Sequence, residues 1–584
     1  MTPSLRIDVD LELIKLQGPD NLARHLPPEA QVARRGPLVL VLLGQPWIDG
    51  ALSADALLAQ HAARGAGLLD SLKGAYAIAL IDTSTPAVTL QVDRMARHTW
   101  CYAQRGTQLS FSNRADLVAD GAPLDAQALF SYLSDHVIAA PDTVFEGVRR
   151  LPAAHRLRFD RQGVAVQAHW IPQFDESGPR EFGALKEEFR DLLTRSVTRE
   201  YARFSANGCG SFLSGGTDSS TVSGLLRQVA GRRVKAYSIG FDADGYDEMD
   251  YARIAARHFD LDHREHYLTP AEVTAGMPLV AASYDQPFGN SSAVAAYHCA
   301  RVAREEGCSA LLAGDGGDEL FGGNARYAKQ SVFNWYYKVP SALRQGVLEP
   351  LLSLPVAARV RGVSKAASYV RQARVPMPER MHMYNLLRHL GLEEVLCPEF
   401  LRAVEPNLAQ GLQKAVYETT GGAHVVNRML AYDWRFTLAD NDLPKVLGTC
   451  GLADMGVGFP MLDDDLIDFS LRLPVDYKLK GLRLRWFFKQ ALKDFLPEAI
   501  LVKKKQGFGL PFGVWALRDQ GLAKLADDAL AEFGTRGVVS TSFMTKLRKE
   551  LLPAHPGYFG ELVWVLTMLE LWLRQHRPSF RIST

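Results

Sequence analysis

Residues 212–220 read Phe-Leu-Ser-Gly-Gly-Thr-Asp-Ser-Ser and lie between an apolar run and a helical pattern. The preceding residues 209–213 are short and apolar enough for a buried parallel strand. After the loop, serine hydroxyls are expected to cap a helix in which Val222, Leu225 and Leu226 follow at helical spacing. Because a strand, a glycine loop and a helix N-terminus direct N–H groups at an anion, the stretch predicts a phosphate loop. It is not a Walker loop, since no Gly-Lys-Ser/Thr follows.

The residues around this loop predict a doubly wound parallel sheet. A second strand is expected at residues 234–241, with helical patterns before it at 225–229 and after it at 251–259. An amphipathic helix at 187–204 leads into the loop. This β-α-β spacing favours a parallel sheet that binds a nucleotide at the carboxyl ends of its strands.

A second glycine-rich loop follows another short apolar run. Residues 309–323 read Ser-Ala-Leu-Leu-Ala-Gly-Asp-Gly-Gly-Asp-Glu-Leu-Phe-Gly-Gly. Carboxylates crowded at a strand end repel one another unless a cation lies among them. Mg²⁺ takes one or two carboxylates together with phosphate oxygens. We therefore expect Asp218 from the first loop and Asp318 from the second to hold Mg²⁺ beside a nucleotide.

The two loops together resemble the signature pair of the asparagine synthetase family. The resemblance extends over nearly the whole chain after residue 37, and further matching segments are residues 245–248, 285–288, 473–478, 503–511 and 564–572. It implies an ATP-dependent ligase that splits ATP into AMP and pyrophosphate. The ATP-binding residues that it implies are Leu213, Ser214, Gly215, Gly216, Asp218, Ser219, Gly314 and Asp315, with adenine along Ser238, Ile239 and Gly240.

The resemblance also implies three catalytic residues. Asp315 stands where relatives carry the residue that handles the amine proton, so it is the candidate general base. Arg485 stands where the family has a lysine on the pyrophosphate, and it adds bidentate geometry. Lys445 is the third catalytic candidate. The stretch at residues 453–463 departs from the family, because Gly456 and Gly458 replace a Glu and an Arg, which predicts an altered amino-acid pocket.

The first third of the chain is rich in short strand patterns, at residues 38–43, 75–81, 88–92 and 109–112. Residues 74–82, 93–98 and 111–113 resemble a class II glutamine amidotransferase domain, a layered α+β fold. That family attacks glutamine with an N-terminal Cys, but residue 2 here is Thr and the first cysteine is Cys101. Gly44-Gln45-Pro46 replaces the glutamine-binding Asn-Gly-Glu segment. We expect a degenerate scaffold without glutaminase activity; Thr2 as a substitute nucleophile is the less favoured alternative.

Length and composition are consistent with this division. The 584 residues predict an amidotransferase-like domain at 1–175, a linker at 172–179 and a ligase domain at 184–584 whose helical region 329–432 has no assigned ligand. The net charge of +1 does not indicate binding to nucleic acid or to an anionic membrane. Scattered cysteines, a charged start at residues 6–10 and short apolar runs predict a cytoplasmic protein without a signal peptide or membrane span.

Three functions stay open at this point. The chain has the ligase motifs but lacks the glutaminase motifs. In this it resembles β-lactam synthetases and lasso-peptide cyclases, which join an internal amine to an activated carboxylate. This favours amide formation on a natural product or peptide, with a precursor peptide and its processing protease as candidate partners. Asparagine synthesis from free ammonia is the second function. A non-catalytic family member that acts as a binding partner is the third; the oligomeric state is not predicted.

Overall fold

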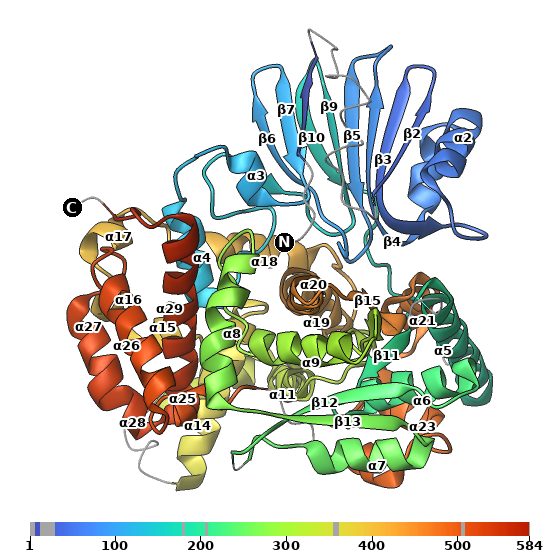
Figure 1. The fold of residues 1–584 in the computed structure, drawn as a ribbon. Helices are drawn as coiled ribbons and strands as arrows, with labels where there is room; N and C mark the ends of the chain where they lie inside the picture. The colour runs from blue at the N-terminus through green and yellow to red at the C-terminus, as the bar shows by residue number, and fades with distance from the viewer. Residues whose placement is uncertain are drawn as a thin grey trace.

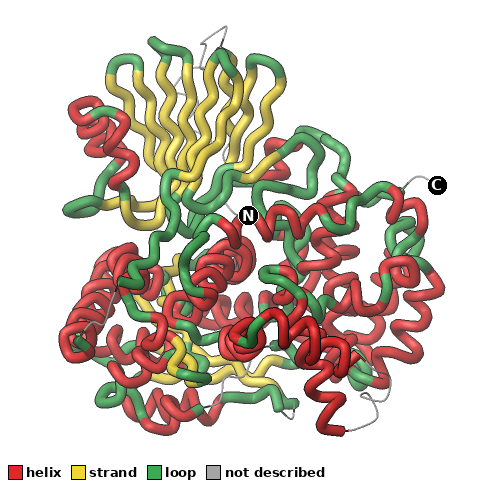
Figure 2. The backbone as a smooth tube through the Cα atoms, turned by 180° about the vertical axis from the view of Figure 1, so that it is seen from behind, coloured by secondary structure: helices red, strands yellow, loops and turns green. Residues whose placement is uncertain are grey.

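The computed structural model describes residues 6–11, 30–177, 181–204, 208–243, 245–353, 361–503 and 509–582. A strand-rich N-terminal part lies against a larger helix-rich part that contains a sheet of its own (Figure 1). The view from behind shows the same division, with the N-terminal strands gathered at one end of the molecule (Figure 2).

Two antiparallel sheets make up the N-terminal part. The four-stranded sheet has the order β1 (Arg6–Asp10), β7 (Gln108–Ser112), β6 (Cys101–Arg105), β8 (Arg149–Arg150). The six-stranded sheet has the order β10 (Gly163–Ala168), β9 (His155–Asp160), β5 (Ala87–Val92), β4 (Lys73–Asp82), β3 (Leu38–Trp47), β2 (Gln31–Arg35). The four strands expected from the sequence correspond to β3, β4, β5 and β7.

The two sheets pack face to face through alternating apolar side chains such as Val41, Leu90 and Phe111. Helix α2 (Ala54–Arg64) covers the outer face of the six-stranded sheet through Leu57 and Leu58. Helix α3 (Ala115–Ala119) lies against β6 and β7 of the other sheet, whereas α4 (Ala126–Asp135) packs against the helical second part, where Tyr132 donates a 2.9 Å hydrogen bond to the carbonyl of Val565. The N-terminal part is therefore a layered α+β structure, as the sequence predicts.

The second part contains a five-stranded parallel sheet. Its order is β13 (Asp262–Leu268), β12 (Lys235–Phe241), β11 (Cys209–Phe212), β14 (Ala310–Leu312), β15 (Gly456–Gly458). The helices packed around it are α5 (Phe182–Phe204), α6 (Thr217–Ala230), α7 (Met249–Phe259), α9 (Ala293–Glu305) and α20 (Leu443–Leu452). The chain reverses its direction of travel across the sheet between β11 and β14, which is where open α/β sheets bind ligands. The predicted doubly wound sheet is confirmed.

Helical additions flank this sheet. The region predicted to be helical contains α11 (Ala325–Asn334), α14 (Arg361–Arg374), α18 (Leu408–Glu418) and α19 (Val425–Asp433). The chain closes with α26 (Gln520–Phe533) and the buried α29 (Pro556–His576), which carries Trp564 and Trp572. In the part of the chain that the structure describes, no helix has the length and apolar character that a membrane crossing requires.

Ion pairs and hydrogen bonds of charged side chains connect the two parts of the chain. Asp464 begins α21 (Asp464–Arg472), is 1% exposed, and accepts a 2.7 Å hydrogen bond from the backbone N–H of Gly74. Its other oxygen pairs with Arg94 at 3.1 Å, and Lys73 pairs with Asp465 at 2.8 Å. Buried and partly buried ion pairs thus hold the N-terminal part against the second part.

Candidate active site

The first loop connects β11 to α6 and is fixed by its glycine and serine residues. Gly215 has a φ of +67°, and a side chain there would overlap the backbone of Tyr251 and Ala252. The hydroxyls of Ser214 and Ser219 lie 3.0 Å apart, and Ser219 Oγ accepts a hydrogen bond from the Ser214 N–H. The predicted serine N-cap is therefore wrong: α6 begins at Thr217, so Ser219 lies inside its first turn, and the residue in the cap position, Gly216, has no side chain that could cap the helix.

The second loop runs from β14 into α10 (Gly317–Phe321) and packs directly against the first. A side chain at Gly314 would come within 2.8 Å of the Ser219 nitrogen, and one at Gly317 would overlap the Asp218 carboxylate. Glycine is therefore needed for the two loops to meet. Their contact brings Asp218 and Asp318 to the same place.

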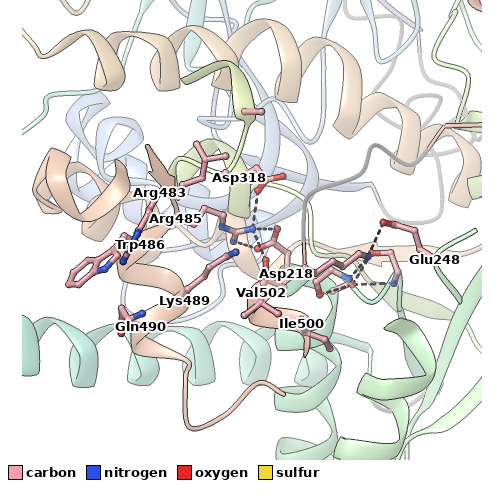
Figure 3. Close-up of a pocket in the computed structure, with 18 of the residues that line it drawn as sticks. Asp218, Glu248, Asp318, Arg483, Arg485, Trp486, Lys489, Gln490, Ile500 and Val502 are labelled. Atoms are coloured by element: carbon pink, nitrogen blue, oxygen red, sulfur yellow. Dashed lines mark hydrogen bonds and ion pairs between the residues drawn. The ribbon is translucent and has the colours of Figure 1, made fainter. Parts of the chain in front are cut away.

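Arg485 lies between these two carboxylates (Figure 3). Its Nη1 atom is 2.6 Å from Asp218 Oδ2 and 2.9 Å from Asp318 Oδ1, while Nη2 bonds to Asp218 Oδ1. The side chain is 5% exposed, and its guanidinium stacks 4.0 Å above the Phe488 ring centroid. Burial disfavours its charge, but the two carboxylates outweigh burial and raise the pKa of Arg485. The arginine is held as a cation.

The backbone holds Arg485 in an unusual conformation. It has a φ of +54°, which is uncommon for a residue with a side chain, and it precedes α23 (Trp486–Ala491). Its N–H donates a 2.8 Å hydrogen bond to the carbonyl of Lys478. Within the described residues its buried Nε has no hydrogen-bond partner. Such strain concentrates at functional sites.

A cavity of about 750 Å³ surrounds this cluster. From the sequence-predicted set it is lined by Ser214, Gly216, Asp218, Ser219, Asp318 and Arg485. The sequence interpretation assigned no role to Lys489 or to Lys503, the first residue of the matching segment 503–511, and both residues line the cavity. Lys489 lies one helical turn after Arg485. This spacing of four residues is visible in the sequence and would have indicated that the two side chains lie on the same side of the chain. Burial and then the Arg485 charge lower the pKa of Lys489. Lys503 Nζ pairs with Glu248 Oε1 at 2.9 Å.

Asp315 and Lys445 form a separate pair outside the lining of this cavity. Asp315 Oδ1 lies 3.8 Å from Lys445 Nζ, and Lys445 Nζ lies 3.1 Å from Asp442 Oδ1. Burial raises the pKa of Asp315 to about 6, against the charge of Lys445, which lowers it. Burial also opposes the Lys445 charge, but Asp442 and Asp315 prevail and raise its pKa.

The residues expected along the adenine lie at the end of β12. Ser238 Oγ donates to the carbonyl of Leu213 and lies 2.7 Å from His263 Nε2. Gly240 approaches Tyr267 and Asp247, which line a second, open cavity of about 480 Å³. The hydrogen bond between Ser238 and Leu213 connects the loop to this strand. The expected adenine residues Ser238, Ile239 and Gly240 do not line the cavity around Arg485.

The two glycines that replace family side chains lie on β15 against α5. A side chain at Gly458 would come within 2.7 Å of Glu200 Oε2, and one at Gly456 within 2.9 Å of Phe204 Cε1. Side chains of α5 therefore fill the space beside these glycines.

The remaining candidate nucleophiles of the N-terminal part are a buried cysteine and a residue outside the described range. Cys101 is fully buried on β6, and burial raises its pKa to about 12, so it is a protonated core thiol. Thr2 lies outside the described residues. Gly44, Gln45 and Pro46 are part of β3.

Comparisons with known proteins match both parts of the chain to families. The Asparagine synthase family profile matches residues 188–574, and the Glutamine amidotransferase domain profile matches residues 49–170. Asparagine synthetase (glutamine-hydrolyzing) 1 of Bacillus subtilis is 22% identical over 455 residues, covering 77% of this chain and 68% of that protein. A putative asparagine synthetase (glutamine-hydrolyzing) of Mycobacterium bovis is 26% identical over 473 residues, covering 79% and 70%.

The chain therefore belongs to the asparagine synthase family, with an N-terminal domain of the glutamine amidotransferase type. It is an ATP-dependent carbon–nitrogen ligase of the asparagine-synthetase kind.

Proposed function

We propose that residues 184–584 adenylate a carboxylate and couple it to an amine, while residues 1–175 serve as a scaffold without glutaminase activity. A carboxylate oxygen attacks the α-phosphorus of ATP and pyrophosphate leaves. The amine nitrogen then attacks the acyl carbon, AMP leaves, and the amine loses a proton. The observation that carries this proposal is the Arg485 guanidinium held between Asp218 and Asp318 at the loop that follows β11.

The leaving pyrophosphate would be stabilised by preorganised donors around the first loop. The uncapped first turn of α6 offers backbone N–H groups to an anion. Hydroxyls come from Ser214 and Ser219, and positive charge comes from Arg485 and Lys489, all of which line one cavity. Donors aimed at developing charge are the largest single contribution in many enzymes.

The carboxylates of this site also fit Mg²⁺. Oxygens of Asp218 and Asp318 lie within 2.9 Å of the same Arg485 Nη1 atom, so both carboxylates already converge on one cation. Carboxylate oxygens are the ligands that Mg²⁺ prefers. Asp218 and Asp318 would hold the ion, which would add positive charge at the pyrophosphate. Arg485 would then donate to the phosphate oxygens instead of to these carboxylates.

Asp315 is the proposed general base for the amine. With a pKa of about 6 it is mostly ionised at neutral pH, and Lys445 at 3.8 Å holds the carboxylate. A base with a pKa near the working pH is efficient in proton transfer. The acylation step needs no base, since its nucleophile is an ionised carboxylate.

The substrates are proposed to be a small-molecule or peptide carboxylate and amine, with intramolecular lactam formation on a precursor peptide as the favoured case. Two features support a source of nitrogen other than glutamine: Gly44-Gln45-Pro46 in place of the expected Asn-Gly-Glu segment, and the buried thiol of Cys101. Gly456 and Gly458 support an acceptor pocket different from that of asparagine synthetases. Asparagine formation from free ammonia is the second candidate, because the relatives are named asparagine synthetases.

Pyrophosphate release from Mg-ATP tests these alternatives. We would supply aspartate with ammonium chloride in one series and candidate precursor peptides in the other, each with and without glutamine. The proposal expects peptide-dependent pyrophosphate that glutamine does not increase. Asparagine formed from aspartate and ammonium would favour the second candidate. Glutamate released from glutamine in step with ATP use would refute the scaffold role of residues 1–175.

A further inference from the structure

Two histidines and a glutamate meet at the edge of the parallel sheet, outside the lining of the cavity around Arg485. His266 lies on the edge strand β13, Glu272 lies in the first turn of α8 (Pro270–Ser283), and His298 lies on α9; Figure 1 shows these three elements together. One possible ligand atom from each side chain lies within 4.8 Å of those of the other two. In the part of the chain that the structure describes, no second group of three His, Cys, Asp or Glu side chains converges in this way.

The carboxylate of Glu272 is held so that one of its oxygens faces the histidines. Its Oε2 atom accepts hydrogen bonds from the Thr269 N–H at 3.0 Å and from the Thr269 hydroxyl at 2.9 Å, which completes a capping box. Its Oε1 atom lies 3.0 Å from His266 Nε2. Hydrogen bonds to the second oxygen orient a carboxylate ligand for a metal ion. The cap of α8 therefore presents Oε1 to the cluster.

His298 has the tautomer of a metal ligand that bonds through Nδ1. Arg301 Nη2 lies 3.2 Å from His298 Nδ1, and a guanidinium can only donate, so Nδ1 accepts and Nε2 carries the proton. His298 Nε2 then donates to the backbone carbonyl of Glu272 at 3.2 Å. Metal-bound imidazoles typically donate their second N–H to a carbonyl or a carboxylate in this way. Nδ1 is thus the nitrogen that can bind a cation.

A cationic group already lies between two of these ligands. Arg301 Nη2 is 3.5 Å from Glu272 Oε1 as well as 3.2 Å from His298 Nδ1. The Arg301 side chain is 35% exposed, and its Nη1 pairs with Glu305 at 2.8 Å. The guanidinium can therefore leave the two ligands and keep its pair with Glu305. Arg301 marks a place where positive charge is stabilised and where a metal ion would replace it.

The chemistry of the three side chains selects the metal. Two imidazole nitrogens and one carboxylate oxygen are a ligand set of zinc sites that keep a fourth position for water. Such a set favours transition metals over Mg²⁺ and Ca²⁺, which prefer oxygen. The side chains of His266 and Glu272 are 27% and 26% exposed, so an ion can enter from solvent. We propose that His266, Glu272 and His298 bind Zn²⁺ or a similar transition-metal ion, at a site separate from Asp218 and Asp318.

Such an ion would brace one edge of the parallel sheet. It would connect β13 to α8 and α9, and His266 is the register partner of Ile239 on β12, the strand expected along the adenine. An ion that binds the folded chain in preference to the unfolded chain raises stability. We therefore expect Zn²⁺, but not Mg²⁺, to raise the thermal unfolding temperature of the full-length protein, and expect His266→Gln to lose this effect.

Competition with a chromophoric zinc indicator measures the affinity of the full-length protein after treatment with a chelator. His266→Gln and Glu272→Gln each remove one ligand, so each should weaken Zn²⁺ binding by at least the 10–100-fold, roughly, that loss of an outer-shell partner costs. Arg301→Gln removes the competing cation and should tighten binding by about two- to fivefold, the strength of one exposed ion pair. A variant that only disturbed the fold would not bind Zn²⁺ more tightly.

A histidine outside the cluster provides the matched control. His389 is exposed on α15 (Leu386–Leu390), so His389→Gln should bind Zn²⁺ as the unaltered protein does. Circular dichroism in the absence of metal checks that each variant folds.

Three outcomes would overturn the proposal. The first is Zn²⁺ binding that is no tighter than Mg²⁺ binding, in which case the cluster serves only as the cap of α8. The second is binding that neither His266→Gln nor Glu272→Gln weakens. The third is binding that is lost in Asp218→Asn but kept in His266→Gln, which would place the ion at the phosphate loop. None of these outcomes bears on pyrophosphate formation from Mg-ATP, so this test is separable from that of the proposed function.

Discussion

Arg485 and Asp218, which are 267 positions apart in the chain, form a two-point ion pair at the phosphate loop. Nη1 lies 2.6 Å from Oδ2, Nη2 bonds to Oδ1, and the same Nη1 reaches Asp318 at 2.9 Å. One buried cation thus unites the loop after β11, the loop after β14 and the segment before α23. The first step of the reaction should depend on this contact.

Replacing Arg485 with alanine should suppress acid-dependent exchange of pyrophosphate into ATP. The loss of one preorganised charged donor costs ~10²–10³ in rate. Arg485→Lys keeps the charge but loses the two-point geometry, so it should lie between alanine and the unaltered enzyme. Arg483→Lys, at an exposed position in the lining of the same cavity, is the control and should exchange normally. Normal exchange in Arg485→Ala would remove Arg485 from the first step.

Replacing Asp315 with asparagine should leave this exchange largely intact and slow amide formation by ~10²–10⁴. In the unaltered enzyme, amide formation should rise with pH through about 6 and level off above it, because only the ionised carboxylate accepts the proton. The variant should lose this rise. Equal losses in exchange and amide formation would instead indicate that Asp315 holds the loop carrying Asp318.

Lys489→Met should weaken the use of ATP without abolishing it. Lys489 lines the cavity beside Arg485, and we expect its ammonium to meet a phosphate oxygen. The loss of one charge-assisted hydrogen bond corresponds to about 10–100-fold in kcat/KM for ATP. Lys493→Met, an exposed position just after α23, is the matched control. Steady-state kinetics at varied ATP concentrations would show equal values for both variants if Lys489 had no phosphate contact.

Asp464→Ala should destabilise the contact between the two parts of the chain. The carboxylate is 1% exposed and joins Arg94 and the Gly74 N–H, so its removal leaves buried donors unpaired. We expect a loss of about 3 kcal/mol in the free energy of unfolding. Asp468→Ala removes a carboxylate that is 39% exposed and should cost less than about 1 kcal/mol. Denaturant unfolding of both variants gives the comparison, and equal losses would contradict the assigned role of Asp464.

The parallel sheet and both loops could be predicted because their signals are local. Glycines and carboxylates directly after short apolar runs mark the ends of β11 and β14. The predicted serine cap of α6 is wrong because the helix begins at Thr217, before the apolar positions that mark it in the sequence, which places Ser219 inside its first turn. The ion pair of Arg485 with both expected metal ligands depends on tertiary structure. So does the cavity of about 610 Å³ between the two parts, whose lining residues come from many segments between Leu43 and Phe459.

Analysis of the products of ATP turnover by ³¹P NMR would show directly whether the protein splits ATP into AMP and pyrophosphate. The protein would be incubated with Mg-ATP and candidate carboxylate and amine substrates in the absence of glutamine. We expect AMP and pyrophosphate in equal amounts with the active substrate, and neither product in Asp218→Asn. ADP and inorganic phosphate as the products, or turnover that requires glutamine, would contradict this expectation.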